Sequence, residues 1–216
     1  TVGVAITQSG TGDIFNLYDG STEVFSVADG GDVSIIDKIV HTGDTNTAIR
    51  FPAADTVTVE TAGSEALRVD SSSRLLVGST SARANFFNGT TDPHIQLEGV
   101  DSPASTVAAI RCSDNAGSPR FLMGKSRGGS VGSNTIVQNN DDLGEISFQG
   151  SDGTQFVQSA DIRAEVDGTP GADDMPGRIV FGTTADGAAS PTERLRITAA
   201  GEVRVPDGGK FTCGDG

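Results

Sequence analysis

The residues that could perform chemistry are few. His41 and His94 are the two histidines of the 216-residue chain, and each lies beside a turn-forming stretch. A zinc site or a Ser-His-Asp triad needs a histidine together with partners at suitable positions, and no such partners can be identified from the sequence around either residue. Both histidines are therefore interpreted as surface residues.

Adjacent carboxylates occur at Asp141-Asp142 and at Asp173-Asp174. A pair of acids can hydrolyse a glycosidic bond, but neighbouring residues on a strand point to opposite faces, and both pairs are interpreted as turn residues. Asp167, Asp173 and Asp174 could supply oxygen ligands for calcium, yet their spacing matches no calcium-binding loop. We predict no catalytic, cofactor-binding or metal-binding residues.

A nucleotide site is not predicted either. The letters GKS at positions 124–126 resemble the end of a phosphate-binding loop, but that loop requires a glycine where this chain has Pro119. The glycine-rich stretch at positions 128–132 lacks the spacing of a dinucleotide-binding loop. It is interpreted as a flexible turn.

The two cysteines, Cys112 and Cys213, are far apart in the sequence and form no CxxC motif, so neither a disulfide framework nor a zinc site is indicated. Cys112 lies in a short apolar run. We expect it to be a small core residue.

Composition excludes several classes of partner. The net charge is −14, which disfavours binding to nucleic acid and to anionic membrane surfaces. No apolar run is long enough to span a bilayer. Hydrophobic residues make up 35% and aromatic residues 5%, tryptophan is absent, and glycine is abundant. This composition argues against an ordinary single globular core.

Short strands organise the chain instead. Alternating apolar and polar residues, interrupted by a turn, occur at positions 23–35, 65–77 and 193–205, and such alternation is typical of half-buried strands. In each copy the predicted inward residues fall at i, i+2, i+8 and i+10. These repeat-core residues are Phe25, Val27, Val33 and Ile35; Leu67, Val69, Leu75 and Val77; and Leu195, Ile197, Val203 and Val205.

A fourth, degenerate copy has the same spacing at Ile49, Phe51, Val57 and Val59. A repeated unit of this kind indicates an array of small supersecondary elements. An isolated hairpin is marginally stable in water, so we expect the apolar faces to be closed by stacking along the chain, by other copies of the chain, or by both.

We divide the chain into a repetitive β segment at 1–78, an inserted β module at 79–144, and a second β segment at 145–216. The predicted fold class is all-β, with repetitive short hairpins that form an elongated, intertwined β-prism or β-helix fibre. Sustained helical periodicity is absent.

One glutamate begins each clear repeat: Glu23, Glu65 and Glu193. Each precedes the first inward residue by two positions, which predicts that it lies on the same strand face. Two interpretations remain open. The glutamate meets a basic side chain or a backbone donor of a neighbouring copy, or it is simply exposed at the end of a strand.

The stretch TERLRITAAG at positions 192–201 resembles a repeat of tail-fibre and other structural proteins of bacteriophages, notably those of marine cyanobacteria. Residues 37–51 with 60–65, and residues 164–178, look like further blocks of such fibres. The resemblance implies a homotrimeric, β-rich fibre on a phage tail that is used in host recognition. In related fibres a self-cleaving C-terminal chaperone often directs trimerisation. The blocks define no receptor-contacting residues.

The leading hypothesis is therefore a virion fibre segment with three partners: its own copies in a homotrimer, other tail or fibre proteins, and a glycan or protein receptor on the host surface. Two alternatives stay open. One is a tailspike-like enzyme that cleaves polysaccharide, against which the single tyrosine and the lack of tryptophan count. The other is a bacterial surface adhesin or extracellular filament.

Overall fold

A computed structural model describes residues 3–212 and confirms that the chain is all-β. The strands are β1 (Phe15–Asp19), β2 (Thr22–Val27), β3 (Val33–Ile35), β4 (Lys38–His41), β5 (Asp44–Ala53), β6 (Thr56–Thr61), β7 (Ser64–Val69), β8 (Leu75–Val77), β9 (Ile95–Leu97), β10 (Asp142–Ser151), β11 (Phe156–Val166), β12 (Gly177–Thr183), β13 (Thr192–Ile197) and β14 (Val203–Arg204). The one helical element among the described residues is the 3-10 turn η1 (Pro103–Ser105).

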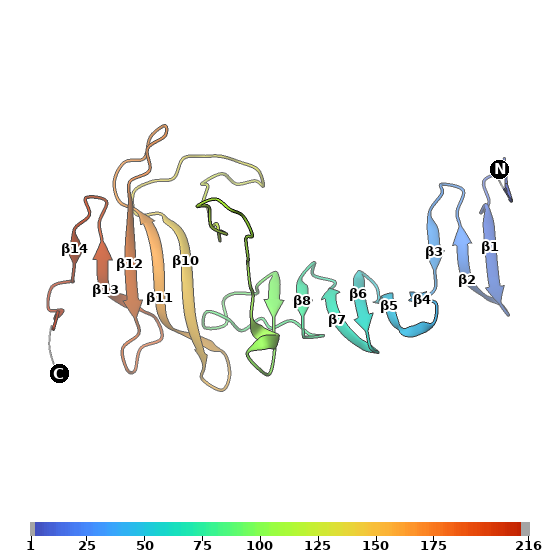
Figure 1. The fold of residues 1–216 in the computed structure, drawn as a ribbon, viewed down its shortest axis with the longest axis horizontal. Helices are drawn as coiled ribbons and strands as arrows, with labels where there is room; N and C mark the ends of the chain where they lie inside the picture. Colours follow the sequence, from blue (N-terminus) through green and yellow to red (C-terminus); the bar gives the residue numbers. More distant parts are fainter. Residues whose placement is uncertain (1–2, 213–216) are drawn as a thin grey trace. The chain divides into compact units, whose positions relative to one another are not determined.

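The strands form three open sheets in which neighbours along the chain are neighbours in space: β1-β2-β3, β4 to β9 in order, and β10 to β14 in order (Figure 1). All pairings are antiparallel except that of β8 with β9, which are parallel and joined by a longer connection. Within a single chain the sheets are therefore meanders that do not close on themselves. The connections between antiparallel neighbours range from two-residue turns, such as 54–55, to the ten-residue loop 167–176 between β11 and β12.

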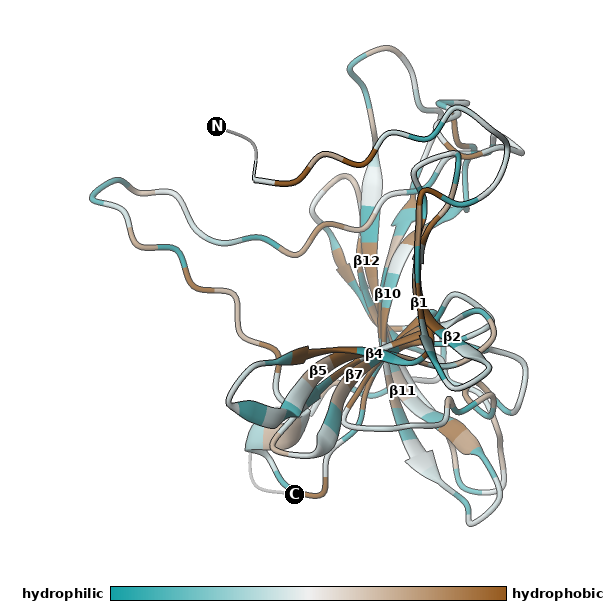
Figure 2. Ribbon diagram, turned by 90° about the vertical axis from the view of Figure 1, so that its right-hand side faces the viewer, coloured by the Kyte–Doolittle hydropathy of each residue, from teal (hydrophilic) through white to brown (hydrophobic). Residues whose placement is uncertain are grey.

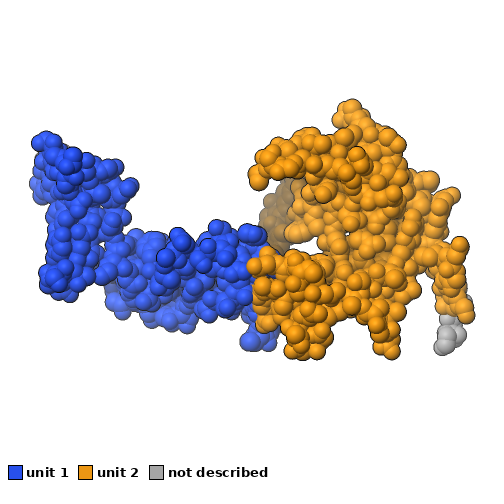
Figure 3. Space-filling view, turned by 180° about the vertical axis from the view of Figure 1, so that it is seen from behind, with its two compact units in different colours: residues 1–82, 93–106 blue, residues 83–92, 107–216 orange. Residues whose placement is uncertain are grey.

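Two compact units share the chain (Figure 3). The first contains Thr1–Ala82 and Pro93–Thr106, and the second contains Arg83–Asp92 and Val107–Gly216. The segment 79–144, predicted to be an inserted β module, is divided between the two units. Its regular structure consists of β9, η1 and the first residues of β10, and the rest is coil.

Residues 83–92 belong to the second unit because they pack against the start of β11. The Phe156 N–H donates to the Asn85 carbonyl at 2.8 Å, and the Asn88 N–H donates to the Phe156 carbonyl at 2.9 Å. The rings of Phe86 and Phe156 stack with their centroids 4.9 Å apart. Residues 83–92 precede β9 in the sequence, yet these contacts hold them on the β10–β14 sheet, which follows β9.

The three sequence repeats share one turn geometry. If the first turn residue is called i, the N–H of residue i donates to the carbonyl of residue i+4. The N–H of residue i+3 donates to the carbonyl of residue i. The first residues are Ala28, Asp70 and Thr198. The residue two positions before the second strand has a positive φ, which is 86° at Gly31, 60° at Ser73 and 79° at Gly201. Glycine adopts this conformation without strain.

The side chains buried within one chain do not form the predicted apolar stripe. The largest fully buried side chains are Leu76, Val166, Val180, Thr58 and Asp161. Leu76 lies between the predicted core residues Leu75 and Val77 and therefore points to the opposite face of its sheet. Figure 2 shows that hydrophobic residues are concentrated along the strands, while the loops are mostly hydrophilic.

Gly182 provides a close approach that a larger residue would prevent. It lies on β12 opposite Asp161 of β11, and a Cβ at this position would lie 1.9 Å from Asp161 Oδ1 and 3.0 Å from Pro191 Cβ. Since the Asp161 side chain is fully buried, it has little room to move. The glycine is thus required by packing and not by its backbone angles.

We predict that Gly182→Ala lowers the free energy of unfolding by about 1–3 kcal/mol, because overpacking forces the strands or Asp161 to shift. Gly150→Ala is the matched control, since a Cβ on this β10 glycine meets nothing within 4 Å. Guanidinium unfolding of the two variants compares them. Equal stability of both variants would contradict the packing role of Gly182.

Candidate assembly surface

One face of the β4–β9 sheet carries an unbroken apolar row across every strand. Cross-strand pairing aligns its members as Ile39, Ile49, Val59, Leu67, Val77 and Leu97. A second row on the same face runs through Val57, Val69, Leu75 and Ile95. These rows are open to solvent in a single chain: Ile39 is 58% exposed and Ile95 is 74% exposed.

The β10–β14 sheet repeats this arrangement. One row pairs Ile146, Ile162, Phe181 and Leu195, and the next pairs Gly144, Ala164, Ile179, Ile197 and Val203. Val203 is 65% exposed, and Ile146 and Ile179 are also exposed. Met123 covers one end of this face, above Gly144, and borders an apolar hollow of about 190 Å³ lined also by Ile146, Ile162, Ala164 and Ile179.

The β1–β3 sheet is a smaller version of the same design. Leu17, Phe25 and Ile35 form one row, and Phe15, Val27 and Val33 form the next. The rings of Phe15 and Phe25 meet edge to face at 6.2 Å. All three sheets therefore present an apolar face that nothing in the described part of the chain covers completely. We name these three faces together the apolar faces.

The opposite face of each larger sheet is polar and bonded within the chain. In the first, Arg50, Thr58, Arg68, Leu76 and Gln96 pair across the strands. In the second, Glu145, Arg163, Val180, Arg196 and Arg204 do so. Each sheet buries one small side chain, Thr58 or Val180, between two arginines.

The repeat glutamates lie on this polar face, so the prediction that they share a face with the inward residues is wrong. A β-bulge explains the difference. Leu67 pairs with Val59 but Glu65 pairs with Glu60, which leaves Ala66 as an extra residue. An extra residue shifts the alternation by one position. The same bulge occurs in the other two repeats, where Val24 and Arg194 are the extra residues.

Because of the bulge, a glutamate and an arginine three residues later meet on one face. Glu65 accepts two hydrogen bonds from Arg68, both at 2.7 Å, and Glu193 accepts two from Arg196 at 2.6 and 2.5 Å. The cation thus comes from the same strand, and not from a neighbouring copy. In the first repeat the corresponding position is Ser26, and Glu23 accepts a hydrogen bond from the Tyr18 hydroxyl at 3.2 Å.

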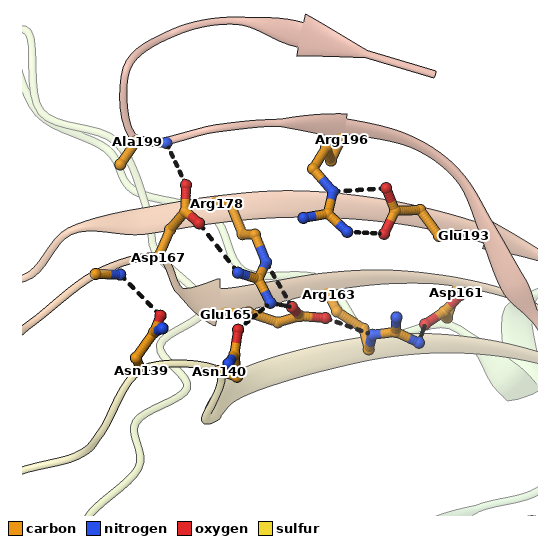
Figure 4. A network of polar contacts seen from close by, with 11 residues as sticks. Asn139, Asn140, Asp161, Arg163, Glu165, Asp167, Arg178, Glu193, Arg196 and Ala199 are labelled. Carbon is orange, nitrogen blue, oxygen red and sulfur yellow. Dashed lines mark hydrogen bonds and ion pairs between the residues drawn. The ribbon is translucent and has the colours of Figure 1, made fainter. Parts of the chain in front are cut away.

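An ion-pair network crosses the polar face of the β10–β14 sheet (Figure 4). Arg178 donates to Glu165, to Asp167 at 3.0 Å and to Asn140 at 2.9 Å. Arg163 bridges Asp161 at 2.6 Å and Glu165 at 3.2 Å. The network connects β11, β12 and the connection before β10, and it fixes the register of these elements.

The network shifts the pKa of its acids. The hydrogen bonds from Arg196 hold the pKa of Glu193 below its usual range. The Ala199 N–H, followed by Arg178, lowers the pKa of Asp167. Glu145 behaves in the opposite way, since burial and then the charge of Asp161 raise its pKa, although Gln158 donates a hydrogen bond to it.

Eleven of the twelve predicted repeat-core residues lie on the apolar faces, whereas Val205 follows the end of β14 and lines a hollow with Glu193, Arg196 and Arg204 of the polar face. None of the twelve is fully buried within one chain. Val33, Val69, Ile197 and Val203 are exposed, and the others are half-buried. Their burial in a core therefore stays a prediction about an assembly. The predicted repeat core did not include Ile39, Ile95, Ile146 and Ile179, which complete the rows. The alternation at Ile95 with Leu97 and at Ile179 with Phe181 was the available signal.

The residues considered for chemistry are dispersed. Cys112 is exposed, so the expectation that it is a core residue is wrong; Cys213 lies outside the described residues. His41 and His94 are exposed. Asp141 accepts two hydrogen bonds from Arg127 at 2.6 Å, which is the main cause of its lowered pKa. Over residues 3–212, no group of three or more His, Cys, Asp or Glu side chains is arranged to hold a metal ion.

Comparison with solved structures identifies this arrangement. The carboxy-terminal domain of the bacteriophage T5 L-shaped tail fibre superimposes with a TM-score of 0.60 at 15% sequence identity, over 94% of this chain and 80% of that one. The chain shares the fold of this tail-fibre domain. The same fibre domain with its intramolecular chaperone domain matches with a TM-score of 0.61 at 16% identity, over 94% of this chain and 56% of that one.

At this level of identity the likeness concerns the fold. No family model matches the chain, and no curated protein does. Among the described residues, no helix has both the length and the apolar character needed to cross a membrane. Of the predictions from sequence, the all-β fold of a tail-fibre domain is confirmed.

We predict that Glu65→Ala and Glu193→Ala each lower the free energy of unfolding by about 0.5–1.5 kcal/mol per chain, because each removes a half-buried bidentate pair. Glu23→Ala is the control, since Glu23 is exposed and has no arginine three residues later. Thermal unfolding at moderate ionic strength measures the difference. A loss as large for Glu23→Ala as for Glu65→Ala would show that the ion pair contributes nothing specific.

We predict that Glu145→Gln and Glu193→Gln respond to pH with opposite signs. A raised pKa means that ionised Glu145 costs stability above its folded-state pKa, so Glu145→Gln should raise the melting temperature near pH 7. A lowered pKa means that ionised Glu193 contributes stability above the ordinary glutamate pKa. Glu193→Gln should therefore lower the melting temperature near pH 7.

Both effects should disappear as the pH falls below the range in which glutamate ionises, at about pH 4 and lower. Melting temperatures measured from neutral to acidic pH test this. Shifts of the same sign for the two variants at neutral pH would contradict the assignment of the two environments.

Proposed function

We propose that this chain is a structural segment of a bacteriophage tail fibre that assembles as a homotrimer and takes part in attachment to the host cell. The observation that carries the proposal is the set of apolar rows left open on all three sheets, in a chain with the fold of a tail-fibre domain. A homotrimer gives every row a counterpart, because each chain supplies the same surface.

The size of the apolar faces supports assembly. Burying one Val, Leu, Ile or Phe side chain contributes roughly 1.5–3 kcal/mol. The first row of the β4–β9 sheet alone contains Ile39, Ile49, Val59, Leu67, Val77 and Leu97. Faces of this kind rarely stay exposed in monomeric proteins, because they promote nonspecific association. A closed ring of three copies removes them from water without leaving a face for further growth.

In this role the polar faces point outward and carry the ion-pair networks at the solvent boundary. The high negative charge then keeps neighbouring fibres apart and the assembly soluble. Loops between strands are the parts that remain free to touch a host glycan or protein receptor, and three copies present each loop three times, which strengthens weak binding by multivalency. The location is the virion, with other tail or fibre proteins as partners.

We propose further that the segment is not an enzyme. The buried acids Asp161 and Glu165 are engaged by Arg163 and Arg178, an arrangement that holds both carboxylates in ion pairs within the sheet. Incubation of the purified chain with host envelope polysaccharide should release no reducing sugar. Release of reducing sugar would favour the tailspike-like alternative.

Static light scattering on the purified chain tests the assembly. We expect a mass three times the chain mass of 22.0 kDa. A folded monomer with the same β content would overturn the proposal, because each sheet would then tolerate its apolar face in water.

We predict that Ile49→Asp shifts the trimer to monomer, because it places a charge in the apolar row that the proposed trimer buries, and an unpaired buried charge costs several kcal/mol. Ile49 is exposed in one chain, so the monomer should keep its β-sheet circular dichroism. Val100→Asp is the control, as Val100 is fully exposed and lies outside the rows. An unchanged mass for Ile49→Asp would contradict the predicted interface.

A further inference from the structure

We propose that residues 107–122, named here the arm, dock onto the β10–β14 sheet of a second copy of the chain. The proposal rests on the trimer proposed above and specifies which segment crosses between copies. The arm belongs to the unit that contains this sheet, and it contains neither strand nor helix (Figure 1).

The arm is exposed along its whole length, although it is rich in apolar residues. The arm has two limbs, one before and one after a bend near Asn115. Val107 and Ile110 on the first limb are each 84% exposed, and Phe121 and Leu122 on the second limb are 86% and 81% exposed. Four large apolar side chains on a segment without its own core need a covering surface. A long connection without secondary structure is uncommon in a compact domain unless it binds something.

The hydrogen bonds of the arm, within the described residues, stay inside it. Arg111 donates to the Asn115 side chain at 3.0 Å, and the Gly117 N–H donates to the same oxygen at 3.0 Å. These contacts shape the bend between the two limbs. The backbone N–H and C=O groups of both limbs make no backbone hydrogen bond to the described sheets. They are therefore free to pair with another chain.

The β10–β14 sheet offers a matching surface. Strand β10 is ten residues long, lies at the edge of its sheet, and exchanges backbone hydrogen bonds with β11 alone among the described residues. An open edge of this length readily accepts an added strand. Beside it lies the apolar hollow of about 190 Å³ bordered by Met123, Ile146 and Ile179, which has room for an apolar side chain of a neighbouring arm.

Charge favours a second copy as the occupant. The arm carries two arginines, Arg111 and Arg120, against the single acid Asp114, whereas the edge strand β10 carries Asp142 and Glu145 and no basic residue. A cationic arm is attracted to the acidic edge strand of a second copy, and such complementarity guides association. The arm and the sheet are different surfaces, so the contact is head-to-tail and closes into a ring when three copies are related by rotation.

The experiment compares Phe121→Ser/Leu122→Ser with the control Val131→Ser, which removes a fully exposed apolar residue outside the arm. All three side chains are exposed in one chain, so none of the changes should unfold the sheets. Light scattering over a dilution series should show the double variant dissociating at a concentration more than about tenfold higher than the wild type. The control should match the wild type.

Limited trypsin digestion with peptide mapping gives a second measurement. Cleavage after Arg111 and Arg120 should be slow in the assembled wild type and fast in the dissociated double variant. Two results together would overturn the arm's role: rapid cleavage of the wild-type trimer at both sites, and dissociation of the double variant at the wild-type concentration. The trimer proposal would then still stand, and the arm would be free for another partner. A monomeric wild type would overturn both.

Discussion

The rest of the structure depends on the hydrophobic effect acting on sheets that have no second layer. A sheet with one apolar face must cover that face, and a compact domain does so with a helix or with another sheet. The described part of this chain provides no such layer for the rows through Leu67 and Leu195, and the side chains buried within the chain lie mainly on the polar face or under loops. In the proposed trimer, packing between copies removes these rows from water.

The polar faces have a different role, which is to specify the register of the strands within each sheet. The bulges at Ala66 and Arg194 turn a glutamate to the side of the arginine three residues later, so the second and third repeats each carry a bidentate ion pair. Arg178 and Arg163 extend this bonding across strands around Glu165. A slip by one residue would separate these pairs and move every apolar side chain to the wrong face. The ion pairs and the apolar rows therefore specify the same register.

Much of the fold was accessible from sequence because strands leave a local signal. The i, i+2, i+8, i+10 spacing located the hairpins around Phe25, Leu67 and Leu195, and the structure joins them with the same hydrogen-bonded turn. The face of the glutamates and the exposure of Cys112 were predicted incorrectly. A bulge changes the alternation by one residue without a distinctive sequence mark, and a short apolar run such as that around Cys112 is read as buried when it lies on an exposed arm.

The sequence by itself determined the all-β class, the positions of the repeats, and the absence of recognisable catalytic or metal-binding motifs, because these depend on residue types at short spacing. Only the tertiary structure decided that separate apolar pairs align into continuous rows, that β9 joins β8 in parallel, and that Glu65 finds its cation in its own strand. These features depend on the pairing of residues that are distant in sequence and on bulges that reset the alternation. Both arise from the competition among all the strands for partners, which no single stretch of the sequence records.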